Sequence, residues 1–178
     1  MIKAILVVIA VVAVVFVVVV AMRPAEYRVE RSASVNAAPA VVFAEVNDLH
    51  KWQEFSPWAK LDPAAKNTYD GPPAGTGAVF TWAGNAKVGE GRMTITESRP
   101  SELIRIKLDF VKPFTSTADA KFTFEPKGNQ TLVTWSMSGH QNFFERAMCV
   151  VMNGKKMIGG EMEKGLAQLK AVAEGSKG

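Results

Sequence analysis

The chain of 178 residues is poor in the side chains that build disulfides and metal sites. Its one cysteine, Cys149, rules out an intrachain disulfide and a multi-cysteine metal site. No carboxylates stand at a recognisable zinc-ligand spacing from the two histidines, His50 and His140. We therefore expect no metal and no cofactor.

Charge is also scarce, with 21 Lys and Arg against 17 Asp and Glu. Once Lys3 and Arg23 are set aside, residues 24–178 hold 19 basic and 17 acidic side chains. No basic cluster remains beyond the pair Lys155 and Lys156, whereas a nucleic-acid-binding domain carries a basic patch or stripe. We expect no nucleic-acid partner.

The familiar catalytic patterns are absent too. No Ser-His-Asp set can be read from the sequence. Gly75 and Gly77 begin a glycine pattern, but Phe80 stands where a dinucleotide loop needs its third glycine. Cys149 follows Ala147 and Met148, an apolar setting that favours an inert buried thiol over a nucleophile. We predict no catalytic residue.

What the sequence does contain is a long apolar run, Ala4 to Met22, without a charged side chain. About 20 helical residues cross the roughly 30 Å hydrocarbon layer of a bilayer. The alternative is a cleaved signal peptide, whose apolar region has about 7–15 residues before a small-residue cleavage site. The longer run and its end at Met22-Arg23-Pro24 favour a single-pass anchor over residues 1–23.

The side of the membrane is only weakly indicated. Lys3 and the amino terminus precede the run, and Arg23, Arg28 and Arg31 follow it. The positive-inside rule then leans slightly toward a cytoplasmic domain.

The remainder reads as a strand, two short helices, six strands and a long helical segment. Alternating side chains predict a strand over 27–35, and apolar spacing predicts a short helix over 40–46. Asp48 can cap a second short helix that ends at Phe55. Six further strands are predicted over 67–70, 78–83, 88–97, 103–111, 116–125 and 130–139.

One face of these strands is apolar and the other polar, which is typical of an antiparallel sheet covered on one side. The segment 143–173 carries an apolar stripe that can cover this sheet, from Ile158 through Met162 to Leu169. Asn153-Gly154 predicts a kink or a break in that helix.

This order resembles the START-like, helix-grip fold. The segments 35–43, 48–52 and 56–58 resemble that superfamily's strand-to-helix entry, second helix and following loop, and 75–82 and 89–95 resemble its strands. The chain is similar to bacterial SRPBCC proteins of the polyketide cyclase/dehydrase group, which include membrane-anchored members. We therefore expect an α+β helix-grip domain over 24–174, a frayed tail over 175–178, and a place in the bacterial cell membrane.

The resemblance implies an apolar cavity between a curved sheet and the last helix. Aromatic, methionine and inward-phased charged side chains would line it. The candidates are Phe80, Trp82, Met93, Glu97, Phe110, Phe122, Phe124, Trp135, Met137, Met157 and Met162. Plain core packing is the alternative for most of them. Glu97 and Arg31 share the phase of apolar neighbours and could act as inward anchors or proton-transfer groups.

Three hypotheses follow. The first is membrane-anchored binding or transport of a hydrophobic small molecule or lipid. The second is a cyclase- or dehydrase-like enzyme, and the third is a stress or interaction module whose cavity is filled by its own side chains. The oligomeric state stays open at this point.

Overall fold

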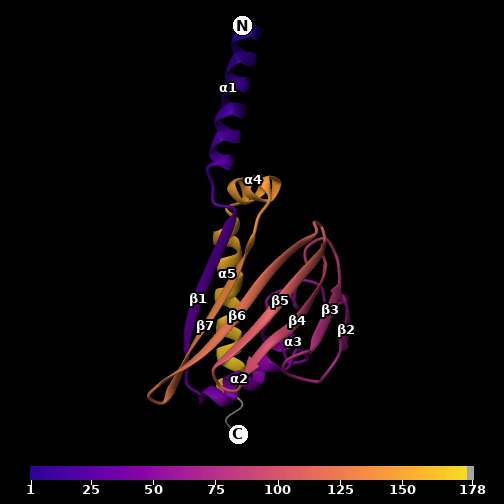
Figure 1. The fold of residues 1–178 in the computed structure, drawn as a ribbon, viewed down its shortest axis with the longest axis vertical. Helices are drawn as coiled ribbons and strands as arrows, with labels where there is room; N and C mark the ends of the chain where they lie inside the picture. Colours follow the sequence, from indigo (N-terminus) through magenta and orange to yellow (C-terminus); the bar gives the residue numbers. More distant parts are fainter. Residues whose placement is uncertain (176–178) are drawn as a thin grey trace.

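The computed structural model describes residues 1–175, and its elements follow the predicted order (Figure 1). The helices are α1 (Ile2–Ala21), α2 (Pro39–Asn47), α3 (Trp52–Phe55), α4 (Phe143–Met152) and α5 (Gly154–Gly175). The strands are β1 (Glu26–Val35), β2 (Lys66–Asp70), β3 (Val79–Ala83), β4 (Glu90–Arg99), β5 (Leu103–Lys112), β6 (Ser116–Lys127) and β7 (Gln130–His140). Of the predicted frayed tail, Gly175 ends α5 and the other three residues lie outside the described part.

The strands form one antiparallel sheet in the order β1-β7-β6-β5-β4-β3-β2. Strands β2 to β7 each pair with their neighbour in the sequence, and β1 adds to the free edge of β7. Figure 1 shows this sheet curving around α5. The predicted α+β class and helix-grip fold are confirmed.

Helix α5 covers the concave, inner face of the sheet. Its predicted stripe is buried at Met162, Leu166 and Leu169. The domain is closed at the end far from α1 by α2, where Val42 and Val46 are fully buried. This packing explains the amphipathic pattern of the final helical segment, because its apolar stripe faces the sheet.

The predicted break near Asn153 is confirmed. Asn153 takes a left-handed conformation and ends α4, and Gly154 begins α5. Helix α4 begins with a capping box, in which the side chains of Asn142 and Glu145 each accept a hydrogen bond from the other's backbone N–H. Both ends of α4 are therefore specified by local sequence.

The predicted capping role of Asp48 is wrong. Helix α3 has only four residues and begins at Trp52, after Lys51. The Asp48 carboxylate instead accepts a hydrogen bond from the His50 backbone N–H at 2.9 Å. Asp48 thus stabilises the turn that precedes α3.

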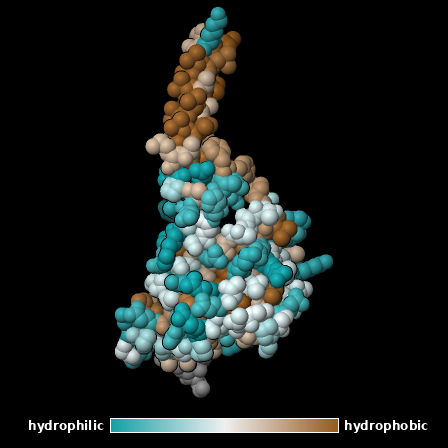
Figure 2. All heavy atoms as spheres, in the orientation of Figure 1, coloured by the Kyte–Doolittle hydropathy of each residue, from teal (hydrophilic) through white to brown (hydrophobic). Residues whose placement is uncertain are grey.

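Helix α1 extends away from the domain (Figure 2). Of its side chains only Val20 is buried. It has 20 residues and a mean hydropathy of 3.6, which is long and apolar enough to cross a membrane. A bilayer-spanning anchor and an amino-terminal signal sequence both fit these properties.

Candidate functional site

The inner face of the sheet is built by strict strand alternation. Directly paired residues such as Phe122 and Trp135, or Phe80 and Met93, point to the same side. All four are buried between the sheet and the helices. The predicted apolar face therefore forms, but its middle and the end nearer α1 are packed differently.

The middle of the inner face is filled by aromatic rings, which we call the central cluster: Trp52, Trp58, Phe122 and Trp135. The Phe122 and Trp135 rings stack with centroids 4.8 Å apart, and Trp52 and Trp58 present edges to Trp135 at 6.3 and 6.0 Å. Gly165 of α5 lies against Trp135, where a Cβ would come within 2.9 Å of the ring. Rings at these separations leave no room for a ligand among them.

The central cluster holds one unpaired polar atom. The indole N–H of Trp135 is buried and has no hydrogen-bond partner among the described residues. An unpaired buried donor costs about 1–3 kcal/mol, so ring packing must outweigh this cost.

The end of the inner face nearer α1 is built differently, and we call it the anchor-side region. It consists of Tyr27, Trp82, Gly91, Phe110, Ala118 and Gly139. Its three aromatic side chains are only half-buried. Between them the floor of the sheet carries Gly91, Gly139 and Ala118, and the buried Leu108 stands directly opposite Ala118. The region therefore presents half-buried aromatic surface on the inner face.

The two glycines of this region are required by the rings above them. A Cβ on Gly91 would overlap the Trp82 ring, and one on Gly139 would come within 2.9 Å of the Tyr27 ring. The Trp82 indole N–H donates to the Val88 carbonyl at 3.1 Å, which fixes the ring over Gly91. Trp82 and Phe110 meet edge to face at 6.0 Å.

Tyr27 is the titratable group of the anchor-side region. Burial raises the pKa of its phenol, and electrostatic interactions with the nearby Glu145, Cys149 and Asp119 side chains raise it further. The phenol is therefore neutral at physiological pH and can both donate and accept a hydrogen bond.

Most of the predicted site residues do line the inner face. Seven of them are buried: Phe80, Met93, Phe122, Phe124, Trp135, Met137 and Met162. Trp82 and Phe110 are half-buried on the same face. Met157 does not join them, because it lies on the outer side of α5 with 51% of its surface exposed.

The predicted inward position of Glu97 is wrong. A β-bulge between Ile95 and Glu97 shifts the alternation of β4, so Glu97 joins the outer face. Its carboxylate pairs there with Arg105 at 2.8 Å and Arg99 at 3.1 Å. The proton-transfer role considered for Glu97 loses its geometric basis.

Arg31 keeps the predicted inward phase, but α5 covers it. Its guanidinium lies over Gly159, where a Cβ would overlap it, and pairs with Glu163. Arg31 thus fastens β1 to α5 beside the central cluster, where Trp135 is its direct cross-strand partner. The Arg31 guanidinium is therefore occupied by the ion pair with Glu163.

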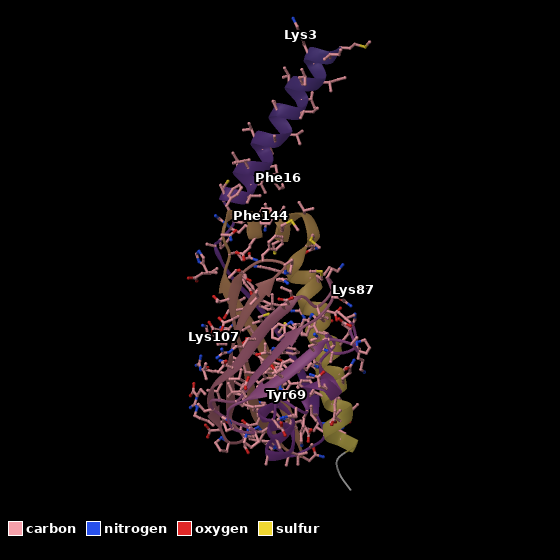
Figure 3. The ribbon with its side chains drawn as sticks, turned by 90° about the vertical axis from the view of Figure 1, so that its right-hand side faces the viewer. Lys3, Phe16, Tyr69, Lys87, Lys107 and Phe144 are labelled. Carbon is pink, nitrogen blue, oxygen red and sulfur yellow. The ribbon has the colours of Figure 1, made fainter. Side chains whose placement is uncertain are left out.

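A surface cleft that the sequence did not reveal lies beside the β2 edge. It has a volume of about 240 Å³ and is lined by His50, Tyr69 and Pro72, among others. Figure 3 labels Tyr69 in the lower part of the domain. Its ring stacks on that of His50 at 4.0 Å, and burial raises the pKa of the Tyr69 phenol. The lining comes from three separate segments, so no local motif could have predicted it.

An aromatic row connects this cleft with the anchor-side region. Successive ring centroids are 5.1 Å apart from Tyr69 to Phe80, 5.9 Å from Phe80 to Trp82, and 6.0 Å from Trp82 to Phe110. Phe80 is buried in the middle of this row, so the row leaves aromatic surface partly exposed at Tyr69 on one side and at Trp82 and Phe110 on the other. Within residues 1–175, no three metal-ligating side chains come together.

Comparison with known proteins identifies the class of this domain. The model of the family described as polyketide cyclase / dehydrase and lipid transport matches residues 26–174. The chain belongs to this family. A comparison with curated proteins finds no similar sequence.

Solved structures share the fold at low identity. A Thermus thermophilus protein has a TM-score of 0.60 at 14% identity, with 85% of this chain and 100% of that chain covered. The Aha1 dimer from Colwellia psychrerythraea has a TM-score of 0.59 at 14% identity, with 85% and 99% covered. The di-domain ARO/CYC StfQ from the steffimycin biosynthetic pathway has a TM-score of 0.61 at 13% identity, with 85% and 51% covered. At these identities the likeness shows the fold alone.

Proposed function

We propose that this protein binds or carries a hydrophobic small molecule or a lipid, and that α1 anchors it as a single-pass protein in the bacterial cell membrane. In this proposal residues 1–23 are the anchor and residues 24–174 the binding domain. The family's description as lipid transport agrees with this proposal.

The observation that carries the proposal is the anchor-side region. Trp82 and Phe110 flank Gly91 on the inner face, and both rings are only half-buried, which leaves part of their apolar surface uncovered. Ligand sites are lined mainly by apolar and aromatic side chains with few polar groups. The Tyr27 phenol supplies one such polar group at the edge.

The anchor would serve this role by proximity. Tethering raises the effective concentration of a binding site near its target, without any new contact. A site held at the bilayer would exchange an apolar ligand with the membrane over a short path.

A module without a ligand is the second candidate, and the central cluster favours it. Trp135 and Phe122 fill the middle of the inner face, so a ligand would have to bind beside them. The enzyme alternative is weaker, because Glu97 lies on the outer face of the sheet and Arg31 is paired with Glu163.

The test uses residues 24–178, because the hydrophobic core begins at Val29 and α1 buries only Val20. The purified domain is extracted with organic solvent and the extract analysed by mass spectrometry. Binding of anilinonaphthalene sulfonate, a fluorescent apolar probe, is measured in parallel and competed with fatty acids and phospholipids. We expect a co-purifying apolar molecule or a competable probe. If no apolar molecule co-purifies and no lipid competes with the probe, ligand binding is overturned and the module without a ligand is favoured.

A further inference from the structure

Helix α4 carries an apolar stripe that faces away from the domain. Phe144, Met148, Val151 and Met152 lie on one side of the helix, and we call them the apolar face of α4. Their exposed fractions are 53, 37, 70 and 52%. No residue of α4 is buried, whereas the stripe of α5 is buried against the sheet. A surface helix of a globular domain turns its apolar stripe inward, so α4 has the opposite arrangement.

This exposure is built into the fold. The capping box at Asn142 and the left-handed residue Asn153 fix both ends of α4. Arg146 on the opposite side then holds the helix to the end of α1. Its guanidinium donates to the carbonyl of Arg23 at 3.0 Å and to that of Ala21 at 3.5 Å.

The position of α4 indicates what its apolar face would contact. Figure 1 shows α4 lying crosswise to α1, at the point where α1 meets the domain. In Figure 3, Phe144 lies just below Phe16, at the end of the domain from which α1 extends. In Figure 2, the hydrophobic surface of α1 continues onto this end of the domain. A bilayer that holds α1 therefore ends beside the apolar face of α4.

A second element extends the same surface. Phe114, in the turn between β5 and β6, meets Phe144 edge to face at 5.3 Å and is 49% exposed. Val111 beside it is 55% exposed. Lys155 and Lys156, at the start of α5, are also exposed. An apolar face next to basic side chains is the composition of helices that lie in the membrane interface.

We propose that the apolar face of α4 and the β5–β6 turn at Phe114 form a membrane-docking surface. This surface inserts at the boundary between the headgroups and acyl chains of the bilayer that holds α1. Anionic lipids strengthen the binding of the surface to the bilayer by attracting Lys155 and Lys156. The proposal rests on the anchoring part of the proposed function and is independent of ligand binding. Docking would turn the anchor-side region toward the bilayer, because Phe114 follows the end of β5 that carries Phe110.

The test places a fluorophore at single positions of the full chain. In a Cys149→Ser background, Val151→Cys probes the apolar face of α4, Val12→Cys probes α1, and Lys107→Cys on the outer face of the sheet is the matched control. Each is labelled with NBD and reconstituted into phosphatidylcholine vesicles, with or without phosphatidylglycerol. Spin-labelled lipids with the quencher near the headgroup report contact with the interface.

We expect blue-shifted emission and strong quenching at position 151, and water-like emission without quenching at position 107. Phosphatidylglycerol should increase the quenching at position 151, and Phe144→Glu should reduce it without changing the circular dichroism spectrum. Lipid protection at position 12 with water-like emission at 151 would overturn docking and leave the anchor intact. Water-like emission at position 12 would overturn both. Shielding at 151 without lipid quenching, accompanied by disulfide crosslinking between copies of the unlabelled variant, would assign the surface to a second copy of the chain and overturn docking.

Discussion

The central cluster and the anchor-side region share one sheet and one alternation of side chains, yet Trp52, Phe122 and Trp135 of the first are buried, whereas the rings of the second are only half-buried. In the cluster, Gly165 lets α5 approach until Trp135 touches it. In the anchor-side region, the Trp82 and Tyr27 rings lie over Gly91 and Gly139 and stay half-buried. The difference teaches that one inner face of a helix-grip sheet can bury some of its rings completely and leave others half-buried.

The largest effect on stability is expected from deleting one ring in the central cluster and, separately, one ring in the anchor-side region. Trp135→Ala removes a fully packed ring and should cost about 3–5 kcal/mol of unfolding free energy. Trp82→Ala removes a half-buried ring and should cost about 1–2 kcal/mol. Urea denaturation of both variants measures this difference.

Trp135→Phe is the matched control for the central cluster. It keeps the stack on Phe122 and removes the unpaired indole N–H, so it should cost much less than Trp135→Ala. Equal losses for Trp135→Ala and Trp82→Ala would contradict the distinction between the two regions.

The next effect concerns the floor of the anchor-side region. Gly91→Ala places a Cβ in the Trp82 ring and should destabilise the domain by about 1–3 kcal/mol. The double variant with Trp82→Ala should recover part of this loss, because the overlapping ring is gone. A double-mutant cycle measures the coupling. Simple additivity would show that the ring does not rest on Gly91.

A smaller effect is expected in ligand binding. Phe110→Ala should weaken binding of anilinonaphthalene sulfonate by about tenfold, equivalent to about 1.4 kcal/mol. Trp58→Ala, which removes a half-buried ring from the central cluster, is the matched control and should leave the affinity near that of the wild type. Fluorescence titration of both variants checks this. A loss of affinity in Trp58→Ala alone would place the binding site in the central cluster.

The smallest effect concerns a polar contact that closes the domain far from α1. The Asn36 backbone N–H donates to Glu174 at 2.6 Å, which lowers the pKa of this carboxyl, and Lys170 lowers it further. A lowered pKa stabilises the folded state above the unfolded pKa, and this stability is lost as pH falls through the folded pKa. Glu174→Gln should therefore be slightly less stable at neutral pH.

The difference between Glu174→Gln and the wild type should close as the pH falls. Thermal unfolding followed from neutral to acidic pH measures it. A constant difference across this range would mean that the hydrogen bond to Asn36 does not depend on the charge of Glu174.

Much of this architecture could be predicted because it depends on local rules. Alternation located the strands, and Asn153-Gly154 located the break between α4 and α5. Glu97 was misplaced because a β-bulge leaves no mark in the alternating pattern. The cleft at His50 and Tyr69 was missed because its walls come from separate segments.

The sequence by itself determined the apolar run of α1, the caps of α4, and which strand residues share a face. Each of these depends on neighbours within a few positions of the chain. Only the tertiary structure decided that Trp135 is packed while Trp82 and Phe110 stay half-buried, since that depends on how closely α5 approaches each strand. It also decided that α4 turns its apolar face outward beside α1, because Arg146 joins segments more than 120 residues apart in the chain.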